Sequence, residues 1–400
     1  MSTSSSSIEQ AESCSSWSQL PFDILEMVTK KFNSIEDLYS LGGVCSSWRS
    51  VALSIRKHKN KTLPWLMLTA NYNHTHRDFF SVAENKIYRS NYPKAFYDCQ
   101  CWGSPFGWLV TFAYDRQTFH LLNPFSPLSP RLPLPTLRTF PSPPDRSKTL
   151  LSLFITKAVV VVLHSHNLEE SNHHDQFLVF AIYGLSKNLA YSRPGDKIWT
   201  GVTFKETTPS SSGGQLDIIH LNGQFYSVDS NGSIWLLCDV AANAPNPPTA
   251  IPFASPPPMN ELLKTICGKS GKTISLLEMD AELHLAVRFQ HRNTRKTLLI
   301  EIFKCDASTR EWQKLTTLGD YALFLGTCTS ISIKASDYSA SICTPGCIYY
   351  CYDDYKNHAE IVPPDIGIID VARREIEFLN VDDKRTYHFS APAWVLPTLL

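Results

Sequence analysis

Hydrophobic residues in the first 60 positions recur at helical spacing, and residues 17–32 (WSQLPFDILEMVTKKF) show this most clearly. Apolar side chains return there every three or four positions, at Leu20, Ile24, Leu25, Val28 and Phe32. This pattern predicts a short amphipathic helix with Pro21 in its first turn and Asp23 near the positive end of its dipole. We expect the helix to end near Lys31.

Two more helices are predicted directly after the first. Ser34 is placed as an N-cap, Leu38 and Leu41 form an apolar side, and Gly42-Gly43 ends the second helix. The third helix has its apolar face at Val44, Cys45, Trp48, Val51, Ala52 and Ile55. A basic stretch at 56–61 (RKHKNK) follows, which we interpret as a solvated linker over 56–62.

Three helices of this length rarely bury enough apolar surface to be stable alone, so the module is expected to bind a partner. Each apolar side chain that a partner covers fully contributes roughly 1.5–3 kcal/mol.

The residues of this module resemble an F-box. Leu20-Pro21, the stripe that follows, Leu38, and the Val44-Cys45 and Trp48-Arg49 pairs of "DLYSLGGVCSSWRSVA" stand at the usual positions of the motif. The resemblance implies binding to a Skp-type adaptor and, through it, to a cullin and a RING subunit of a ubiquitin ligase. The residues implied to bind the adaptor are Leu20, Pro21, Ile24, Leu25, Val28, Leu38, Val44, Cys45 and Trp48. Leu41-Gly42-Gly43 departs from the motif, and helical glycines there would cost about 1 kcal/mol each.

Beyond residue 62 the pattern changes to short strands separated by turns. Five stretches share an apolar strand that ends at an Asp, a turn, and a second strand, and these aspartates are Asp115, Asp229, Asp280, Asp306 and Asp370. Each stretch predicts a β-hairpin, since Asp can accept hydrogen bonds from its own turn amides.

Antiparallel hairpins repeated over residues 63–400 favour a β-propeller, because a blade takes roughly 40–50 residues and the length therefore allows about six or seven blades. A long β-sandwich remains an alternative. Residues 63–68 are placed to close the ring by pairing with 391–397. Pro-rich interruptions stand at 124–144 and 245–258.

This region resembles the plant F-box proteins that carry a KIB-type β-propeller. The ordered motifs are GSPFGWLV (103–110), LLNPFSPL (121–128), FYSVDSNG (225–232), LLEMDAELHLAVR (276–288), LGDYALFLG (318–326) and GCIYY (346–350). Kelch repeats are less favoured, because only one Gly pair is present here. Within the motifs we expect Trp108, Trp312 and Phe324 in the core, and Gly103, Gly107, Gly319 and Gly326 at turns or bulges.

Charge and composition exclude several classes of partner. Lys and Arg total 37 and Asp and Glu total 37, so no general field attracts nucleic acid or an anionic membrane. Residues 1–16 are Ser-rich, resemble no signal peptide, and are expected to be disordered. The longest apolar run, 158–163, is too short to span a bilayer and predicts a buried strand. Eleven cysteines without paired spacing indicate a reducing compartment, and we expect the nucleus or the cytoplasm.

Two motifs suggest chemistry but do not match what that chemistry needs. CGKSGKT (267–273) ends like a phosphate loop, but Ile266 stands where the first Gly is needed and a strand follows in place of a helix. Cys343, Cys347 and Cys351 lack a Cys-x-x-Cys pair, so buried thiols are favoured over a zinc site. We expect no cofactor and no metal.

The leading hypothesis is therefore a non-catalytic substrate receptor of a cullin-RING ubiquitin ligase, with the propeller binding an unknown target protein. Rim loops at 164–176 and 207–214 are candidate target contacts. Two alternatives remain: a propeller hydrolase, which would need paired carboxylates at the central channel, and an adaptor-binding scaffold outside any ligase.

Overall fold

The computed structural model divides the chain into two compact units, Met1–Lys61 and Thr62–Thr398. The residues that the structure describes are 17, 20–29, 40–58, 63–68, 77–90, 99–104, 107–125, 131–144, 154–163, 177–205, 213–240, 247–259, 271–338, 342–353, 364–379, 381 and 390–397. The predicted disordered tail at 1–16 lies outside these residues. No helix in the described ranges has both the length and the apolar character to cross a bilayer.

The first unit is helical, as the 3.6-residue pattern predicts. Helix α1 spans Phe22–Thr29 and helix α3 spans Ser46–His58. Between them, a helical segment ends at Gly42 and a turn follows at Gly43, the predicted stop. Helix α3 continues through His58, so the first part of the predicted 56–62 linker is helical. Lys31, Ser34 and Leu38 lie outside the described residues.

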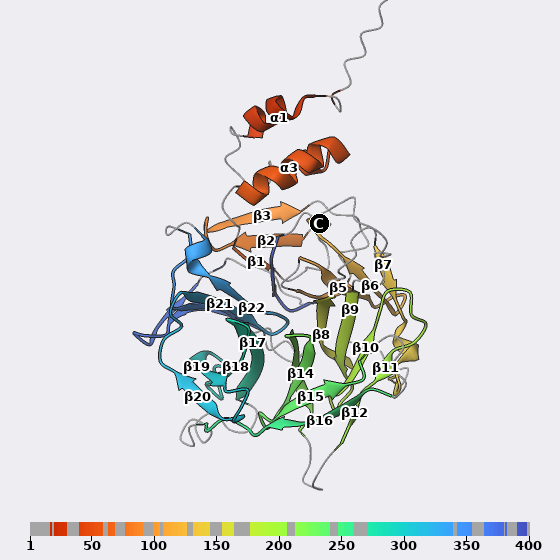
Figure 1. Ribbon diagram of the computed structural model, residues 1–400, viewed down its shortest axis with the longest axis vertical. Coiled ribbons are helices and arrows are strands. Elements are labelled where there is room, and N and C mark those ends of the chain that lie inside the picture. The colour runs from red at the N-terminus through yellow and green to blue at the C-terminus, as the bar shows by residue number, and fades with distance from the viewer. Residues whose placement is uncertain are drawn as a thin grey trace, which may run out of the picture. The chain divides into compact units, whose positions relative to one another are not determined.

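The second unit is a propeller of six sheets, and Figure 1 shows them as blades around a central axis. Blade one contains β1 (Trp65–Met67), β2 (Arg77–Ser81), β3 (Lys86–Ser90) and β26 (Ala393–Val395). Blade two contains β4 (Cys99–Trp102), β5 (Leu109–Ala113), β6 (Thr118–Leu122) and β7 (Leu132–Leu134). Blade three contains β8 (Ile155–Val162), β9 (Phe177–Tyr183), β10 (Asn188–Ser192) and β11 (Thr200–Gly201). The propeller prediction is thus confirmed, with six blades, and the sandwich alternative is wrong.

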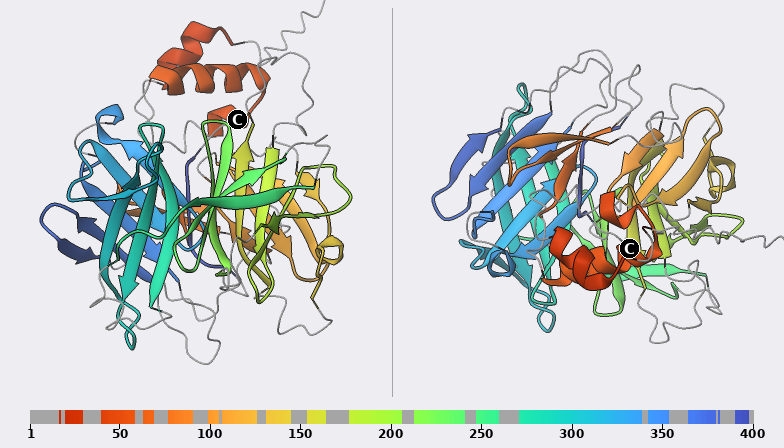
Figure 2. Two further views of the ribbon diagram at one scale, coloured as in Figure 1. Left: turned by 60° about the horizontal axis from the view of Figure 1, so that its bottom comes forward. Right: turned by 90° about the horizontal axis from the view of Figure 1, so that it is seen from above.

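The other three blades complete the ring seen in Figure 1, and Figure 2 shows the strands of the propeller from two other sides. Blade four contains β12 (Thr203–Phe204), β13 (Gln215–Leu221), β14 (Gln224–Asp229), β15 (Ile234–Cys238) and β16 (Thr249–Ala254). Blade five contains β17 (Lys272–Met279), β18 (Glu282–Gln290), β19 (Thr297–Cys305) and β20 (Trp312–Leu315). Blade six contains β21 (Tyr321–Gly326), β22 (Ser330–Lys334), β23 (Cys347–Tyr352), β24 (Asp365–Asp370) and β25 (Glu375–Phe378). Short 3-10 helices occupy Leu137–Thr139 and Ala335–Asp337.

Two blades depart from a simple meander. In blade four, β12 pairs in parallel with β16, so the chain adds an outer strand before it enters the inner strand β13. In blade six, β21 pairs antiparallel with β22 and parallel with β23, which places β22 at the edge next to β17. The two Pro-rich segments that were predicted to interrupt the repeat each contain part of a strand: Pro133 lies in edge strand β7, and Pro252 lies in β16.

All five Asp-centred hairpins form, joining β5 to β6, β14 to β15, β17 to β18, β19 to β20 and β24 to β25. Asp229 shows the reason, since its Oδ1 accepts hydrogen bonds from the amides of Asn231, Gly232 and Ser233 at 2.9–3.0 Å. Gly232 has φ +99°, which the turn requires.

The ring closes through the two ends of the propeller sequence. β26 pairs antiparallel with β1, with Trp65 opposite Val395 and Met67 opposite Ala393. The predicted pairing of 63–68 with 391–397 is therefore confirmed. Trp394 is 1% exposed and donates its indole N–H to the carbonyl of Leu325 at 3.0 Å, which ties blade one to blade six.

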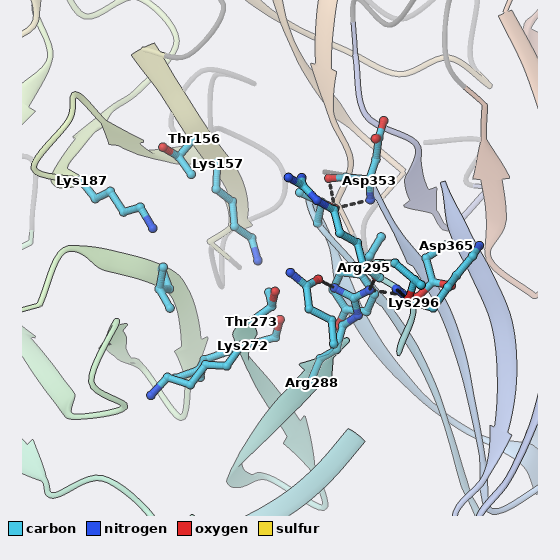
Figure 3. A pocket seen from close by; sticks show the side chains of 17 residues that line it. Thr156, Lys157, Lys187, Lys272, Thr273, Arg288, Arg295, Lys296, Asp353 and Asp365 are labelled. Atoms are coloured by element: carbon cyan, nitrogen blue, oxygen red, sulfur yellow. Dashed lines mark hydrogen bonds and ion pairs between the residues drawn. The ribbon is translucent and has the colours of Figure 1, made fainter. Parts of the chain in front are cut away.

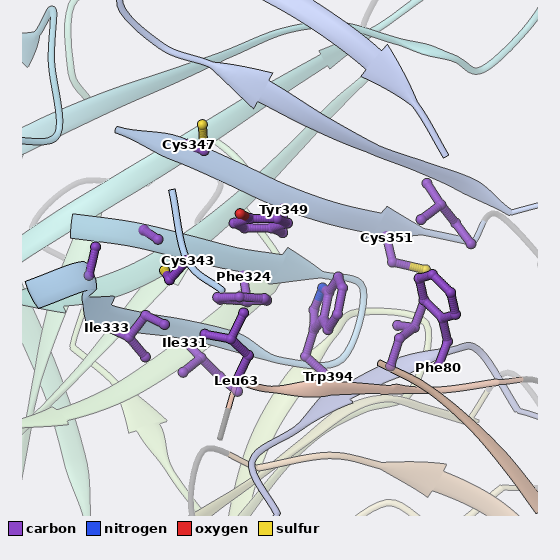
Figure 4. Packing of buried hydrophobic residues seen from close by; sticks show 14 of the residues in the cluster. Leu63, Phe80, Phe324, Ile331, Ile333, Cys343, Cys347, Tyr349, Cys351 and Trp394 are labelled. Atoms are coloured by element: carbon purple, nitrogen blue, oxygen red, sulfur yellow. The ribbon is translucent and has the colours of Figure 1, made fainter. Parts of the chain in front are cut away.

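The interface between blades six and one is an apolar cluster in which Phe324 stacks on Tyr349 with ring centroids 4.7 Å apart (Figure 4). Cys343, Cys347 and Cys351 belong to this cluster, so the predicted buried thiols are confirmed. Trp108 and Phe324 are buried as predicted, but Trp312 is only half-buried, because it lies on the outer strand of blade five.

Gly326 and Gly103 both face Trp394. A Cβ on Gly103 would lie 2.5 Å from the Trp394 carbonyl oxygen, so this position needs glycine for close approach. Gly107 and Gly319 have positive φ, at +78° and +58°, as expected for turns.

Candidate functional site

Helix α1 carries apolar side chains on two faces. One face points into the helical unit, where Leu25 packs with Leu41, Val51 and Ala52 and is 1% exposed. Thr29, one turn after Leu25, is also fully buried. Leu25 and Thr29 are four residues apart, so they lie on the same side of the helix and are buried together.

The other face of α1 is exposed. Phe22, Ile24, Met27 and Val28 are 50%, 37%, 55% and 43% exposed, and Val44 is 54% exposed. Met27 and Val28 follow Ile24 by three and four residues, so these three exposed residues share one side of the helix, and exposed apolar surface of this kind is typical of a partner contact. We call Ile24, Met27 and Val28 the apolar face of α1.

The structure separates the predicted adaptor-binding set into exposed and buried members. Leu25 belongs to the unit's own core, because the apolar stripe read from the sequence wraps two sides of the helix. Leu20, Cys45 and Trp48 are half-buried and Pro21 is exposed. Trp48 donates its indole N–H to the Trp17 carbonyl at 2.9 Å, which joins the start of the module to its last helix. Leu38 lies outside the described residues.

Met27 is the member of the apolar face that sequence reasoning missed. Its signal was present, because Met27 stands three residues after Ile24 and thus on its side of the helix.

A second candidate site is a pocket of about 180 Å³ in the propeller channel, at the end where inner strands β8, β13 and β17 begin. Its lining includes the basic residues Lys157, Lys187, Lys272, Arg288, Arg295 and Lys296 and the acidic residues Asp353 and Asp365. Figure 3 shows Lys157, Lys187 and Lys272 on one side of the open space and the arginines and aspartates on the other. We call this site the basic pocket.

Arg288 is held rigidly in the wall of the basic pocket. Its Nη2 lies 2.9 Å from Asp365 Oδ2, its Nε donates to Thr297 Oγ1 at 2.8 Å, and its guanidinium lies 4.2 Å from the Tyr352 ring centroid. The ion pair is nearly buried, with side chains 4% and 6% exposed. It connects blade five to blade six.

Lys157 forms a second buried ion pair deeper in the channel. Its Nζ lies 2.7 Å from Asp217 Oδ1. Asp217 Oδ2 also accepts the backbone N–H of Leu276 at 3.0 Å. These contacts connect blades three, four and five, so the role of Asp217 is to hold these blades together.

The four other basic residues of the pocket come from turns and strand starts. Lys187 lies in the turn between β9 and β10, Arg295 and Lys296 lie between β18 and β19, and Lys272 opens β17. Lys296 Nζ lies 3.5 Å from Asp365 Oδ1 while its side chain remains 45% exposed. No sequence pattern indicated this cluster, because its members are far apart in a chain of zero net charge.

The structure also places the other sites that sequence motifs suggested. β17 begins at Lys272, so a strand follows CGKSGKT as predicted and no helix N-terminus is available there. The channel carboxylates Asp217 and Asp365 are both in ion pairs, and Asp115 and Asp229 serve turns. Among the described residues, no three His, Cys, Asp or Glu side chains gather as a metal site. The rim segments 164–176 and 207–212 lie outside the described residues.

The cysteine cluster yields a reactivity prediction. Burial raises the pKa of the Cys343 thiol to about 11, so the thiolate is scarce at pH 8. In the native protein we expect Cys343 to react with iodoacetamide at least tenfold more slowly than it does in urea. The less buried Cys45 and Cys238 should react faster than Cys343 in the native protein. Peptide mass spectrometry after timed labelling measures this. Equal rates in native protein and in urea would contradict the packing shown in Figure 4.

The chain thus combines a helical module that has an exposed apolar helix face with a six-bladed propeller. The F-box domain model matches residues 17–60, and the KIB1-4 beta-propeller model matches residues 79–371. The chain belongs to the KIB1-4 beta-propeller family.

Two relatives from Arabidopsis thaliana match nearly the whole chain, and a third matches a part of it. F-box protein At2g17036 is 23% identical over 95% of this chain and 94% of its own length. F-box protein SKIP23 is 22% identical over 95% of both chains. F-box protein At1g10110 is 39% identical over 118 residues, which is 29% of this chain and 28% of that protein. Among solved structures, TolB from Acinetobacter baumannii aligns over 87% of this chain and 72% of its own at a TM-score of 0.40 and 10% identity, too weak a likeness to bear on function.

Proposed function

We propose that this protein is a substrate receptor of a cullin-RING ubiquitin ligase, in which the F-box binds a Skp-type adaptor and the propeller binds the target protein. The observation that carries the proposal is the apolar face of α1, which remains exposed on a module matched by the F-box model. A partner that covers three such side chains offsets part of the entropy lost on association.

In this function the protein performs no bond chemistry. It acts by proximity, since a target held beside the charged ubiquitin carrier presents its lysines at a high effective concentration. The six-bladed ring gives the target a rigid surface built from loops of several blades.

Adaptor binding tests the proposal directly. We expect the full chain to co-purify with a Skp-type adaptor, and Ile24→Ala to weaken the complex about tenfold, since the lost methyl and methylene groups are worth about 1–2 kcal/mol. Titration calorimetry with purified adaptor measures the change.

Leu185→Ala is the matched control, because Leu185 is an apolar residue 91% exposed in the propeller. Its affinity for the adaptor should equal that of the wild type. A wild-type chain that fails to bind the adaptor would overturn the proposal, and an adaptor complex that never supports ubiquitin transfer with cullin and RING would favour a scaffold role.

A further inference from the structure

The basic pocket concentrates positive charge at one end of the channel. Its described lining contains six Lys and Arg side chains against two Asp side chains, and Asp217 behind the lining pairs with Lys157, which leaves an excess of three positive charges in a chain whose net charge is zero. Between walls of low dielectric constant, this excess focuses a positive potential on the open space.

The basic residues differ in how firmly they are held. Arg288 and Lys157 pair with buried carboxylates, and these two ion pairs connect blade five to blade six and blade three to blade four. Lys187, Lys272, Arg295 and Lys296 are half-buried at the pocket's edge, where Lys272 Nζ lies 3.7 Å from Met259 Sδ and Lys296 Nζ lies 3.5 Å from Asp365 Oδ1. The pocket therefore combines a buried, ion-paired wall with half-buried cations at its edge.

The positive charge of the basic pocket indicates that its ligand is an anion. A phosphate monoester carries about 1.5 to 2 negative charges at pH 7, so two phosphate groups would balance the excess of three. Lysine and arginine are the residues that bind phosphate oxygens, with shortened, charge-assisted hydrogen bonds. Thr273 and Gln290 also line the pocket and add polar side chains to its walls.

We propose that the basic pocket binds a ligand bearing two or more phosphate groups. The ligand bridges the lysines of blades three and five and the cations of the β18–β19 turn, and it lies over the buried Arg288–Asp365 pair. Two sources share this chemistry: a small polyphosphorylated molecule and a multiply phosphorylated segment of a target protein.

Inorganic tripolyphosphate is the first probe, titrated by calorimetry into the full chain in 50 mM salt. We expect saturable one-to-one binding that weakens as salt is raised to 300 mM, because ion contacts are screened. Lys187→Gln/Lys272→Gln should weaken binding at least tenfold, since each lost charge-assisted bond contributes appreciably.

Lys197→Gln/Lys205→Gln is the matched control. It removes the same charge at two exposed lysines that do not line the pocket, and it should bind tripolyphosphate as the wild type does. Thermal melts without ligand check that both variants remain folded. No binding to the wild type, or equal weakening in both double variants, would overturn the proposal.

A second titration distinguishes the source. A peptide with two phosphoserines that binds more tightly than tripolyphosphate identifies a phosphorylated target segment, and the reverse order identifies a small polyphosphate; each order supports the proposal. The assay needs no adaptor, so it also separates this inference from the proposed ligase role: Ile24→Ala should leave tripolyphosphate binding unchanged.

Discussion

Replacing Trp394 with alanine is expected to lower the free energy of unfolding of the propeller by about 3–5 kcal/mol. The indole is 1% exposed, lies edge-on to Phe324 at a centroid distance of 5.1 Å, and donates to the Leu325 carbonyl. Its loss leaves a cavity at the junction where β26 closes the ring. Urea denaturation followed by circular dichroism measures the change.

Two variants make this prediction specific. Trp394→Phe keeps most of the apolar volume and loses the hydrogen bond, so its cost should be about 1–2 kcal/mol. Trp312→Ala removes the same side chain from a half-buried position on outer strand β20 and should cost less than Trp394→Ala. If Trp312→Ala lowered the free energy of unfolding as much as Trp394→Ala, the junction between β26 and blade six would contribute no more to stability than the outer strand does.

The second large effect concerns the charged centre of the channel. Asp217→Ala is expected to destabilise the propeller by about 3–5 kcal/mol, because it leaves the Lys157 ammonium buried without its carboxylate. The Leu276 amide loses its acceptor in the same step. Urea denaturation again provides the measurement.

Asp115→Ala provides the comparison, since Asp115 pairs with Arg116 on the surface with both side chains about 70% exposed. Exposed pairs contribute up to about 1 kcal/mol, so this variant should remain close to the wild type. A loss for Asp217→Ala no greater than that for Asp115→Ala would show that the buried pair does not hold the blades together.

The sequence predicted the local structure of this protein well. Helix spacing located α1 and α3, the Asp-centred turns located five hairpins, and the apolar segments at both ends of the propeller predicted its closure. These features depend on neighbours in the chain, or on a periodicity that any blade repeats. The blade number was left at six or seven, because it was predicted only from the length of residues 63–400 and a blade of roughly 40–50 residues.

The candidate sites were predicted less completely, for a physical reason. Leu25 and Ile24 are adjacent in sequence and equally apolar, yet one is in the core and the other faces outward, and only the position of α3 decides between them. The basic pocket was missed altogether. Lys157, Lys187, Lys272 and Arg295 are neighbours only because strands and strand connections from separate blades meet at one channel end.

The pairing of β26 with β1 also affects how the protein is made. A ribosome adds roughly 5–20 residues per second, so tens of seconds pass between the synthesis of β1 and that of its last partner strand. Throughout that time blade one presents an unpaired strand edge, the kind of surface that recruits other chains. If translation ended a few codons before Ala393, β26 would be absent and the edge of β1 would stay unpaired. The nearly complete chain would then be a substrate for chaperones and proteases.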